Sequence, residues 1–311
     1  MSSNPLLIIL GPTATGKTQV AVEVAAGLGG EIVSADSMQV YRELDVGTAK
    51  PTAEERRRVR HHLVDVVDPG EAFNVARFQQ MALKAIRDIH RRGRLPLLVG
   101  GTGLYIRALA EGFVVGQAPP DWDYRRRLEN VAARRGTDHL HRCLSQVDPE
   151  AAREIDQADL KRVIRALEVF RQTGTPKTQL EHRNPPADLD VLKVGLDRPR
   201  EELYRRIDIR VERMIESGWI EEVSRLLNRG LEDWVASSQA LGYRHLAAHV
   251  RGHRGLEETI RLIKRDTRRF AKRQLTWFRR ERGVIWVPAG PSAVPDIVSL
   301  AAGKWPGLKN P

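Results

Sequence analysis

The sequence has almost no cysteine and no long apolar run. Cys143 is the only cysteine among 311 residues, so an intrachain disulfide is impossible and a cysteine-based zinc site is not expected. No apolar run approaches the roughly 18 residues that a membrane-spanning helix needs. Residues Met1–Pro5 lead straight into an apolar segment, without the charged region that opens a secretory signal. From these absences we expect a cytoplasmic protein with no membrane partner.

Positive charge, in contrast, is abundant and concentrated near the end of the sequence. The chain has 51 Lys and Arg against 40 Asp and Glu, a net charge of +11 and a pI near 10.1. Twelve of the cations and four of the acids lie between Arg251 and Arg282. A localised basic element attracts polyanions and favours nucleic-acid binding more than a diffuse excess does. The alternative is a basic surface that binds nothing.

Apolar runs alternate with helical patterns in the first hundred residues. This alternation predicts an α/β fold whose parallel sheet is covered by helices on both faces. The predicted strands are Leu6–Leu10, Glu31–Ser34, His62–Val67 and Leu95–Val99. The predicted helices are Lys17–Leu28, a segment that Asn74 caps and that runs to about Arg91, and a segment from Leu104.

The pattern changes at the proline pairs Pro119-Pro120 and Pro185-Pro186. Every periodic segment between them is typical of helix, and Val191–Leu196 returns to a strand pattern. We therefore predict a core at 1–118, an all-helical insertion domain at 119–186, and completion of the core with basic C-terminal helices at 187–311. A long amphipathic helix is expected at about 256–280, with an apolar stripe that includes Ile260, Ile263, Phe270, Trp277 and Phe278.

The strongest motif follows the first predicted strand. Gly11, Pro12, Thr13, Ala14, Thr15, Gly16, Lys17 and Thr18 fit the pattern G-x-x-x-x-G-K-[ST] in full. The glycines let the backbone turn its N–H groups inward, and the next helix adds its positive N-terminal end. Lys17 supplies charge to the outer phosphates and Thr18 can hold Mg²⁺. The motif predicts a diphosphate site, with ATP or GTP as the default ligand.

Other polar residues follow the predicted strands, and each permits two interpretations. Asp36 at the end of the second strand is either a proton acceptor or a turn residue. The segment Gly100–Gly103 is a second candidate anion cradle, and Gly47–Pro51 is a loop with a cation. The pair His61-His62 is not expected to share a metal ion, because adjacent strand residues point to opposite faces. Lys161 and Arg165 share a helix face that is either solvated or a phosphate clamp.

From Leu6 to Arg280 the sequence resembles the tRNA dimethylallyltransferase family. The resemblance depends on several motifs in the right order rather than on one phosphate loop. It also implies a P-loop NTPase-like core, and the lack of further cysteines matches the short bacterial form. The matching segments are Gly11–Thr18, Ala35–Tyr41, Asp45–Pro51, Val99–Tyr105, Arg162–Glu168, Ala240–Tyr243 and Thr267–Phe278.

The resemblance implies transfer of a five-carbon group from dimethylallyl diphosphate to N6 of adenosine 37, next to the tRNA anticodon. The loop Gly11–Thr18 would then hold a leaving diphosphate, together with Mg²⁺ on Thr18. Asp36 would accept the proton of the amine, and Thr102 would lie near the reacting groups. Lys17 would stabilise the diphosphate with Arg210, although Arg206 and Arg213 are close alternatives to Arg210.

The family's second substrate is the tRNA anticodon stem-loop, whose target base must leave its stack. The basic helix would hold the tRNA backbone, the insertion would clamp the stem-loop from one side, and we expect a monomer. The residues that the resemblance implies for tRNA contact are Asp36, Ser37, Met38, Gln39, Thr102, Arg125, Lys161, Arg162, Val163, Ile164, Arg165, Leu241, Gly242, Tyr243 and Arg244.

Three other functions remain open at this point. An enzyme that prenylates free adenine nucleotides would share Gly11–Thr18 and Asp36 but would need neither the insertion nor the basic helix. A nucleotide-dependent kinase or ATPase that binds RNA would turn over ATP without a prenyl donor. A non-catalytic RNA-binding module would leave the intact phosphate loop without a purpose.

Overall fold

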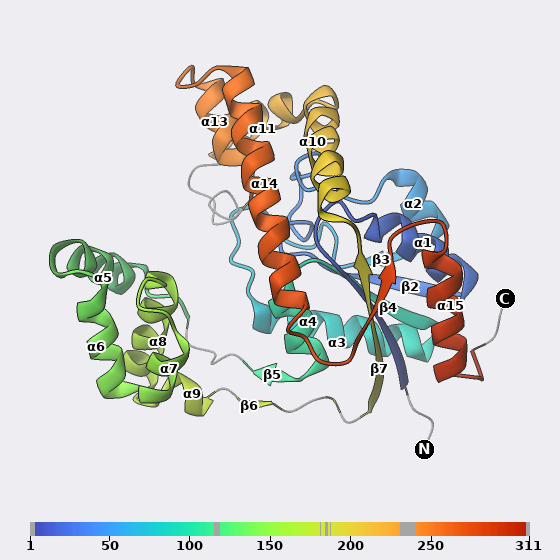
Figure 1. Cartoon of the computed structure of the whole chain (residues 1–311), viewed down its shortest axis with the longest axis horizontal. Coiled ribbons are helices and arrows are strands. Elements are labelled where there is room, and N and C mark those ends of the chain that lie inside the picture. The colour runs from blue at the N-terminus through green and yellow to red at the C-terminus, as the bar shows by residue number, and fades with distance from the viewer. Residues whose placement is uncertain are drawn as a thin grey trace. The chain divides into compact units, whose positions relative to one another are not determined.

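The computed structural model describes residues 4–114, 119–180, 182–183, 186, 188–230 and 240–308. The predicted domain boundaries near 118 and 185 therefore lie at or beside residues outside the described part. Six strands form one parallel sheet in the order β3-β2-β4-β1-β7-β8 (Figure 1). They are β1 (Asn4–Leu10), β2 (Gly30–Ala35), β3 (His61–His62), β4 (Leu95–Gly100), β7 (Leu189–Asp197) and β8 (Val284–Pro288).

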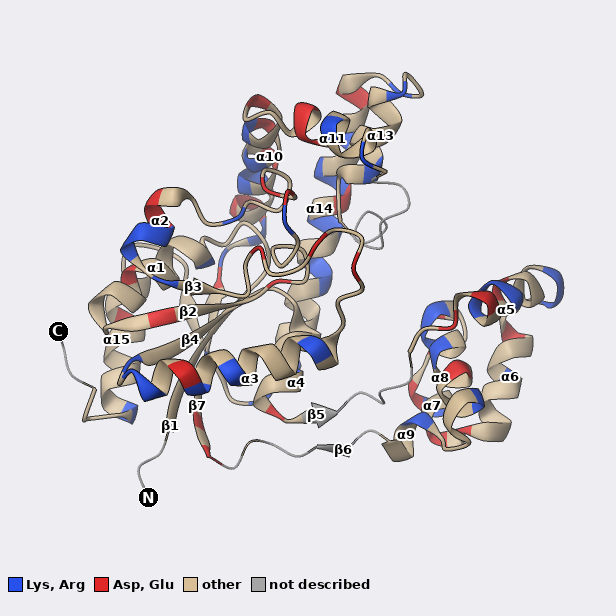
Figure 2. Cartoon of the chain, turned by 180° about the vertical axis from the view of Figure 1, so that it is seen from behind, with Lys and Arg blue, Asp and Glu red and all other residues tan. Residues whose placement is uncertain are grey.

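Helices cover both faces of this sheet. On one face, α1 (Lys17–Gly27) packs against α15 (Ala293–Lys304), and their apolar side chains join Leu7, Ile9 and Leu97 in one core. On the other face lie α3 (Val75–Arg91) and α4 (Gly103–Ala110), as the two opposite views show (Figures 1 and 2). The predicted α/β class with a P-loop-like core is confirmed. No helix among the described residues is long and apolar enough to cross a membrane.

The predicted strand His62–Val67 is wrong in most of its length. The strand β3 ends at His62, because Leu63 and Asp65 adopt left-handed backbone angles with φ of 61° and 58°. The chain then runs beside the segment after β2, where the N–H groups of Val66 and Val67 donate to the carbonyl of Val40. Leu63 and Val67 are buried and Val64 and Val66 are half-buried, and Val66 and Val67 pack with residues of the connection 36–52 rather than in a sheet strand.

A helical group follows β7 and packs on that connection. It contains α10 (Arg200–Glu216), α11 (Trp219–Leu227), α13 (Tyr243–Val250) and the long α14 (Leu256–Phe278). The connection itself carries α2 (Ala53–Arg58). Buried side chains of the helical group, including Trp219 and Tyr243, form one cluster with Val40, Tyr41 and Leu44. The C-terminal helices therefore complete the core around the turn that carries Asp36.

Residues 110–186 form a second compact unit, and residues 1–109 and 187–311 form the first. The second unit contains α5 (Trp122–Arg135), α6 (Thr137–Val147), α7 (Pro149–Glu154), α8 (Leu160–Thr173) and α9 (Lys177–Leu180), with the short antiparallel pair β5 (Phe113–Val114) and β6 (His182–Arg183). Its core is built from one face of α6 and α8, including Leu140, Leu144 and Val163. The unit has a hydrophobic core of its own.

Candidate functional site

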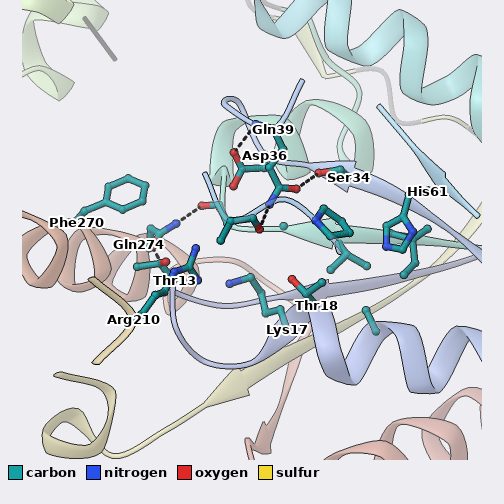
Figure 3. Close-up of a pocket in the computed structure, with 17 residues that line it drawn as sticks. Thr13, Lys17, Thr18, Ser34, Asp36, Gln39, His61, Arg210, Phe270 and Gln274 are labelled. Atoms are coloured by element: carbon teal, nitrogen blue, oxygen red, sulfur yellow. Dashed lines mark hydrogen bonds between the residues drawn. The ribbon is translucent and has the colours of Figure 1, made fainter. Parts of the chain in front are cut away.

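The loop Gly11–Thr18 connects β1 to α1 at the carboxyl edge of the sheet. Its turn requires left-handed backbone at Ala14 (φ 66°) and Gly16 (φ 97°), which directs successive N–H groups to one side. Inside the loop, the hydroxyl of Thr15 donates to the carbonyl oxygen of Pro12 at 2.9 Å. The side chains of Thr13, Lys17 and Thr18 line a cavity of about 100 Å³ (Figure 3). The predicted phosphate loop thus has the geometry of an anion site.

Two half-buried cations line this cavity. Burial and the neighbouring Arg210 lower the pKa of Lys17 to about 7, while Asp36 acts in the opposite direction. The Lys17 ammonium donates to the carbonyl of Pro12 at 2.7 Å. Burial also lowers the pKa of Arg210, with Asp36 again opposing the shift. Concentrated positive charge with little solvent is costly for the free protein and favourable for a bound anion.

Asp36 faces these cations across the cavity (Figure 3). One of its carboxylate oxygens accepts from the N–H groups of Met38 at 2.8 Å and Gln39 at 3.2 Å. Asp36 is therefore a turn residue in the structure, and the turn fixes its position. Thr102 joins the same turn, because its hydroxyl oxygen accepts from the N–H of Ser37 at 3.2 Å. The structure brings Lys17, Asp36 and Arg210 together around one cavity and holds Thr102 against the turn that carries Asp36, while their roles in catalysis stay a prediction.

Gln274 is a site residue that the sequence argument missed. Its side-chain oxygen accepts from the N–H of Thr13 at 2.9 Å, and its amide donates to the carbonyl of Gly101 at 2.8 Å. The side chain therefore holds the phosphate loop and the loop Gly100–Gly103 at a fixed separation. Phe270, one turn earlier on α14, lines the cavity and is 37% exposed. It belongs to the predicted apolar stripe, yet it faces the site rather than the core.

A larger cavity of about 1030 Å³ lies on the outer side of the phosphate loop. Three arginines of α10 line it, and the structure separates their roles. The Arg206 guanidinium donates from Nε to the carbonyl of Ala14 at 2.9 Å, so it supports the loop backbone. Arg210 lines both cavities, whereas Arg213 lines the outer one. Of the three arginines, Arg210 is the one placed to contact both a diphosphate and Asp36.

The segment 45–50, which includes most of the predicted cationic loop Gly47–Pro51, is held by hydrogen bonds from within the protein. The buried Glu222 carboxylate accepts from the N–H groups of Asp45 at 2.9 Å, Val46 at 2.8 Å and Gly47 at 3.3 Å. The Tyr243 hydroxyl donates to the same carboxylate at 2.7 Å. A side chain at Gly47 would meet the Trp219 ring at 2.1 Å, so the loop packs tightly on α11.

The segment 45–50 also reaches the cavity through Gln39. The Gln39 amide donates to the carbonyl of Ala49 at 3.2 Å and to that of Thr48 at 3.4 Å. Its side-chain oxygen accepts from the Ser34 hydroxyl at 3.1 Å. Lys50 donates to the carbonyl of Tyr41 and to the carboxylates of Asp45 and Asp65. Lys50, the cation of this loop, therefore stabilises the fold.

Several predicted tRNA contacts are buried. The side chains of Val163 and Ile164 belong to the core of the second unit, and Tyr243 is fully buried against Glu222. This corrects the prediction for those three side chains, because periodic apolar residues in a motif are packed rather than presented. Gly242 is buried as well, whereas Leu241 is half-buried and Arg244 is exposed.

In the second unit, Arg125 and Arg165 both contact the buried carboxylate of Glu168. Burial alone would raise the pKa of Glu168, but hydrogen bonds from Arg125 and Arg165 lower it below its usual value. Lys161 and Arg162 lie exposed at the start of α8. The two arginines are thus held in fixed positions, while the start of the helix faces solvent.

The basic helix α14 is partly neutralised within the protein. Arg268 pairs with Asp208 at 2.8 Å, and Lys264 pairs with Glu212. Figure 2 shows the Lys and Arg residues along α14. Arg244, Arg269 and Arg273 line a common surface cavity with Leu241 and Gly242. This cavity between α13 and α14 also contains Asp266, which pairs with Arg269 at 3.6 Å.

Metal ligands are few around the phosphate loop. Among the described residues, no group of three or more His, Cys, Asp or Glu side chains could hold a metal ion. The Thr18 hydroxyl and the Asp36 carboxylate line the same cavity and are hard oxygen donors of the kind that Mg²⁺ prefers. His61 and His62 have separate partners, since Nδ1 of His61 contacts the Val59 carbonyl and Nε2 of His62 contacts Glu31. These two side chains fit a magnesium ion whose other ligands would be oxygens of a bound diphosphate and water.

Comparison with known proteins gives consistent matches along the chain. A family model described as IPP transferase matches residues 39–281. The chain is 51% identical over 282 residues to the tRNA dimethylallyltransferase of Thermomicrobium roseum, covering 91% of this chain and 85% of the relative. It is 52% identical over 285 residues to the tRNA dimethylallyltransferase of Desulforudis audaxviator, covering 91% of each.

Solved structures agree with these sequence matches. The full-length tRNA isopentenylpyrophosphate transferase from Bacillus halodurans is 44% identical, with a TM-score of 0.72, and the match covers 97% of this chain and 96% of that one. A eukaryotic dimethylallyltransferase captured acting on tRNA is 26% identical, with a TM-score of 0.75, and the match covers 96% of this chain and 77% of that one.

Proposed function

The chain belongs to the IPP transferase family, and from this premise we propose that it transfers a dimethylallyl group from dimethylallyl diphosphate to N6 of adenosine 37 in tRNA. The observation that carries the proposal is the meeting of Lys17, Arg210 and Asp36 around one cavity. Two cations face the position of a leaving diphosphate, and a carboxylate faces the position of an incoming amine. This arrangement suits an alkyl transfer that releases an anion and a proton.

In this reaction the N6 lone pair forms a bond to C1 of the donor while the bond from C1 to the diphosphate oxygen breaks. The electron pair of that bond leaves with the diphosphate. Lys17 and Arg210, with the backbone N–H groups at the end of the loop where α1 begins, stabilise the growing negative charge. Because these donors are already in place, little reorganisation is needed as the bond breaks.

The proton lost from the amine passes to Asp36. Its carboxylate is held by the N–H groups of Met38 and Gln39, so one oxygen is anchored and the group is oriented toward the cavity. Thr102 supports the same turn through Ser37. A positioned general base typically contributes about 10²- to 10⁴-fold to the rate.

Magnesium completes the diphosphate site in this proposal. Thr18 would hold the ion together with diphosphate oxygens and water. A bound Mg²⁺ would neutralise charge on the leaving group. The remaining work belongs to the protein's own residues: Lys17 and Arg210 bind the diphosphate, and Gln274 fixes the spacing of the two loops that enclose the reacting atoms.

The tRNA anticodon stem-loop is the proposed second substrate. The extruded adenine would enter beside Phe270, whose exposed ring lines the cavity. Ser37, Met38 and Gln39 form the turn next to it. Arg244, Arg269 and Arg273 would contact phosphates, as would Lys161 and Arg162 of the second unit. All of these residues come from one chain, so we propose that the protein acts as a monomer.

One incubation tests this function. Purified protein is mixed with tRNA lacking the modification, labelled dimethylallyl diphosphate and Mg²⁺, and the label in RNA is measured. Label at adenosine 37 is the expected result. ATP hydrolysis with no label in RNA would contradict the proposal and favour an RNA-binding ATPase. Label on free AMP but none on tRNA would favour the enzymes that prenylate free nucleotides.

The role of Asp36 is tested separately. Asp36→Ala is expected to lower kcat by about 10²- to 10⁴-fold, with less than about a twofold change in the tRNA dissociation constant. The measurements are single-turnover kinetics and equilibrium tRNA binding. Equal losses in the two would make Asp36 a binding residue only.

A further inference from the structure

The cavity beside the phosphate loop has two chemically different ends. Figure 3 shows Phe270 and Arg210 at one end and His61 at the other, with Lys17 and Thr18 between them. If the adenine enters beside Phe270 and the diphosphate lies on Lys17 and Thr18, the carbon chain of the donor is directed to the His61 end. That end has no role in the proton and phosphate chemistry described above.

Apolar side chains surround most of the His61 end. Ala21, Ile32 and Val99 line the cavity, and each is at most 8% exposed. They come from α1, β2 and β4, which belong to the rigid part of the core. Such a surface suits a short hydrocarbon chain.

His61 introduces one polar atom into this apolar surface. Its Nδ1 lies 2.8 Å from the carbonyl oxygen of Val59. A carbonyl can only accept, so Nδ1 carries the proton and Nε2 presents a lone pair. Burial lowers the pKa of His61, which keeps the ring neutral and preserves that lone pair.

The Nε2 atom is buried and has no hydrogen-bond partner among the described residues. Buried polar atoms in proteins are nearly always paired, so an orphan that lines a ligand cavity points to a partner on the ligand or to a bound water. The partner has to be a donor, because Nε2 can only accept. A cationic donor would be costly among apolar side chains, so the donor is neutral, and the neutral donor that a short allylic chain can carry with least change is a hydroxyl.

We propose that His61 accepts a hydrogen bond from a hydroxyl group at the far end of the donor's five-carbon chain, so that the protein uses a terminally hydroxylated allylic diphosphate as well as the unsubstituted one. The inference rests on the proposed function. The bonds that form and break are the same for both donors: N6 bonds to C1, the diphosphate leaves with the electron pair, and Asp36 takes the proton. The hydroxyl is carried unchanged into the modified nucleoside.

The test compares the two donors with unmodified tRNA and Mg²⁺, and the nucleosides are identified by mass. The wild-type protein is expected to transfer both chains, with kcat/KM for the hydroxylated donor at least equal to that for dimethylallyl diphosphate. Transfer of dimethylallyl but not of the hydroxylated chain would overturn this inference and leave the proposed function intact. Transfer of neither chain would overturn the proposed function itself.

Variants of His61 identify the atom responsible. In His61→Asn the amide takes the place of Nδ1, so donation to Val59 is kept and the acceptor at Nε2 is removed. The kcat/KM for the hydroxylated donor is expected to fall about tenfold, and that for dimethylallyl diphosphate less than about twofold. His61→Gln places an amide oxygen near the Nε2 position and should restore most of the loss. An equal effect of His61→Asn on both donors would show that Nε2 holds a water instead.

His62 supplies the matched control. It is the adjacent residue, but its ring contacts Glu31 and does not line the cavity. His62→Asn is expected to leave the ratio of the two kcat/KM values unchanged. The kcat/KM values of the wild-type protein for the two donors are measured without any substitution. The inference therefore remains testable even where a His61 variant fails to fold.

Discussion

The loop Gly11–Thr18 and the segment 45–50 line the same outer cavity, yet they use their backbone N–H groups in opposite ways. In the segment 45–50, three successive N–H groups donate to the carboxylate of Glu222. The anion that these N–H groups bind is thus a buried side chain of the protein itself. The phosphate loop borders a cavity lined by Lys17 and Arg210, where the proposed anion is a diphosphate from outside.

The lysines of the two loops differ in the same way. Lys50 is buried and contacts the carboxylates of Asp45 and Asp65 together with a backbone carbonyl. Lys17 is half-buried beside another cation, Arg210, and its pKa is lowered to about 7. A buried charge that meets opposite charges stabilises the fold, whereas one held next to a like charge is costly until a ligand compensates it. We infer that the segment 45–50 is built for stability and the loop Gly11–Thr18 for binding.

Lys17→Met gives the largest effect that this contrast predicts. Loss of the ammonium should lower kcat/KM for the proposed prenyl donor by about 10³-fold, since a positioned charge on the leaving group is removed. The free energy of unfolding should stay constant or increase, because a costly buried charge disappears. Steady-state kinetics and urea unfolding measure the two quantities. A loss of stability comparable with the loss of activity would contradict the division of roles.

Glu222→Ala should have the opposite effect, with a large loss of stability. The substitution leaves three backbone N–H groups and the Tyr243 hydroxyl without their acceptor, and we expect the free energy of unfolding to fall by about 3 kcal/mol or more. The exposed neighbour Glu221 on the same helix is the control, and Glu221→Ala should change stability by less than about 0.5 kcal/mol. Urea unfolding of both variants decides the matter, and equal values for the two would show that Glu222 does not anchor the loop.

The pH dependence of donor binding sharpens the contrast between the lysines. Lys17 is charged below pH 7 and neutral above it, because burial and Arg210 lower its pKa to about 7. A bound diphosphate favours the charged form and raises that pKa in the complex. Binding should therefore be strongest below pH 7 and weaken by up to about tenfold per pH unit above it. Titration calorimetry across pH 6 to 9 tests this, and Lys17→Met should remove the dependence.

Features formed by neighbouring residues could be predicted from the sequence, whereas contacts between residues far apart in the sequence could not. The phosphate loop was predictable because strand, loop and helix are contiguous, so that one motif contains the loop and both elements that hold it. Asp36 was predictable because it directly follows a strand whose end lies at the same sheet edge. Gln274 was not, since it reaches Thr13 across 261 residues and looks like any polar residue of an amphipathic helix.

Burial explains the remaining differences. The segment after His62 is as apolar as a strand, but left-handed backbone at Leu63 and Asp65 turns it away from the sheet. The motif around Tyr243 matched a tRNA-binding family, and the motif alone does not tell whether a matching side chain contacts RNA or holds the residues that do. In the structure Tyr243 helps to hold other residues in place, because its hydroxyl donates to the carboxylate of Glu222.

Tyr243→Phe is the mildest variant and tests that distinction. It removes one of four donors to Glu222 while keeping the ring packed against Trp219 at a centroid distance of 5.7 Å. We expect the free energy of unfolding to fall by about 1 kcal/mol, with no change in tRNA affinity. Combined with Glu222→Ala, it should add little, because the acceptor is already gone. Weaker tRNA binding at unchanged stability would instead make Tyr243 an RNA contact, and the segment 45–50 would then belong to the binding machinery as the phosphate loop does.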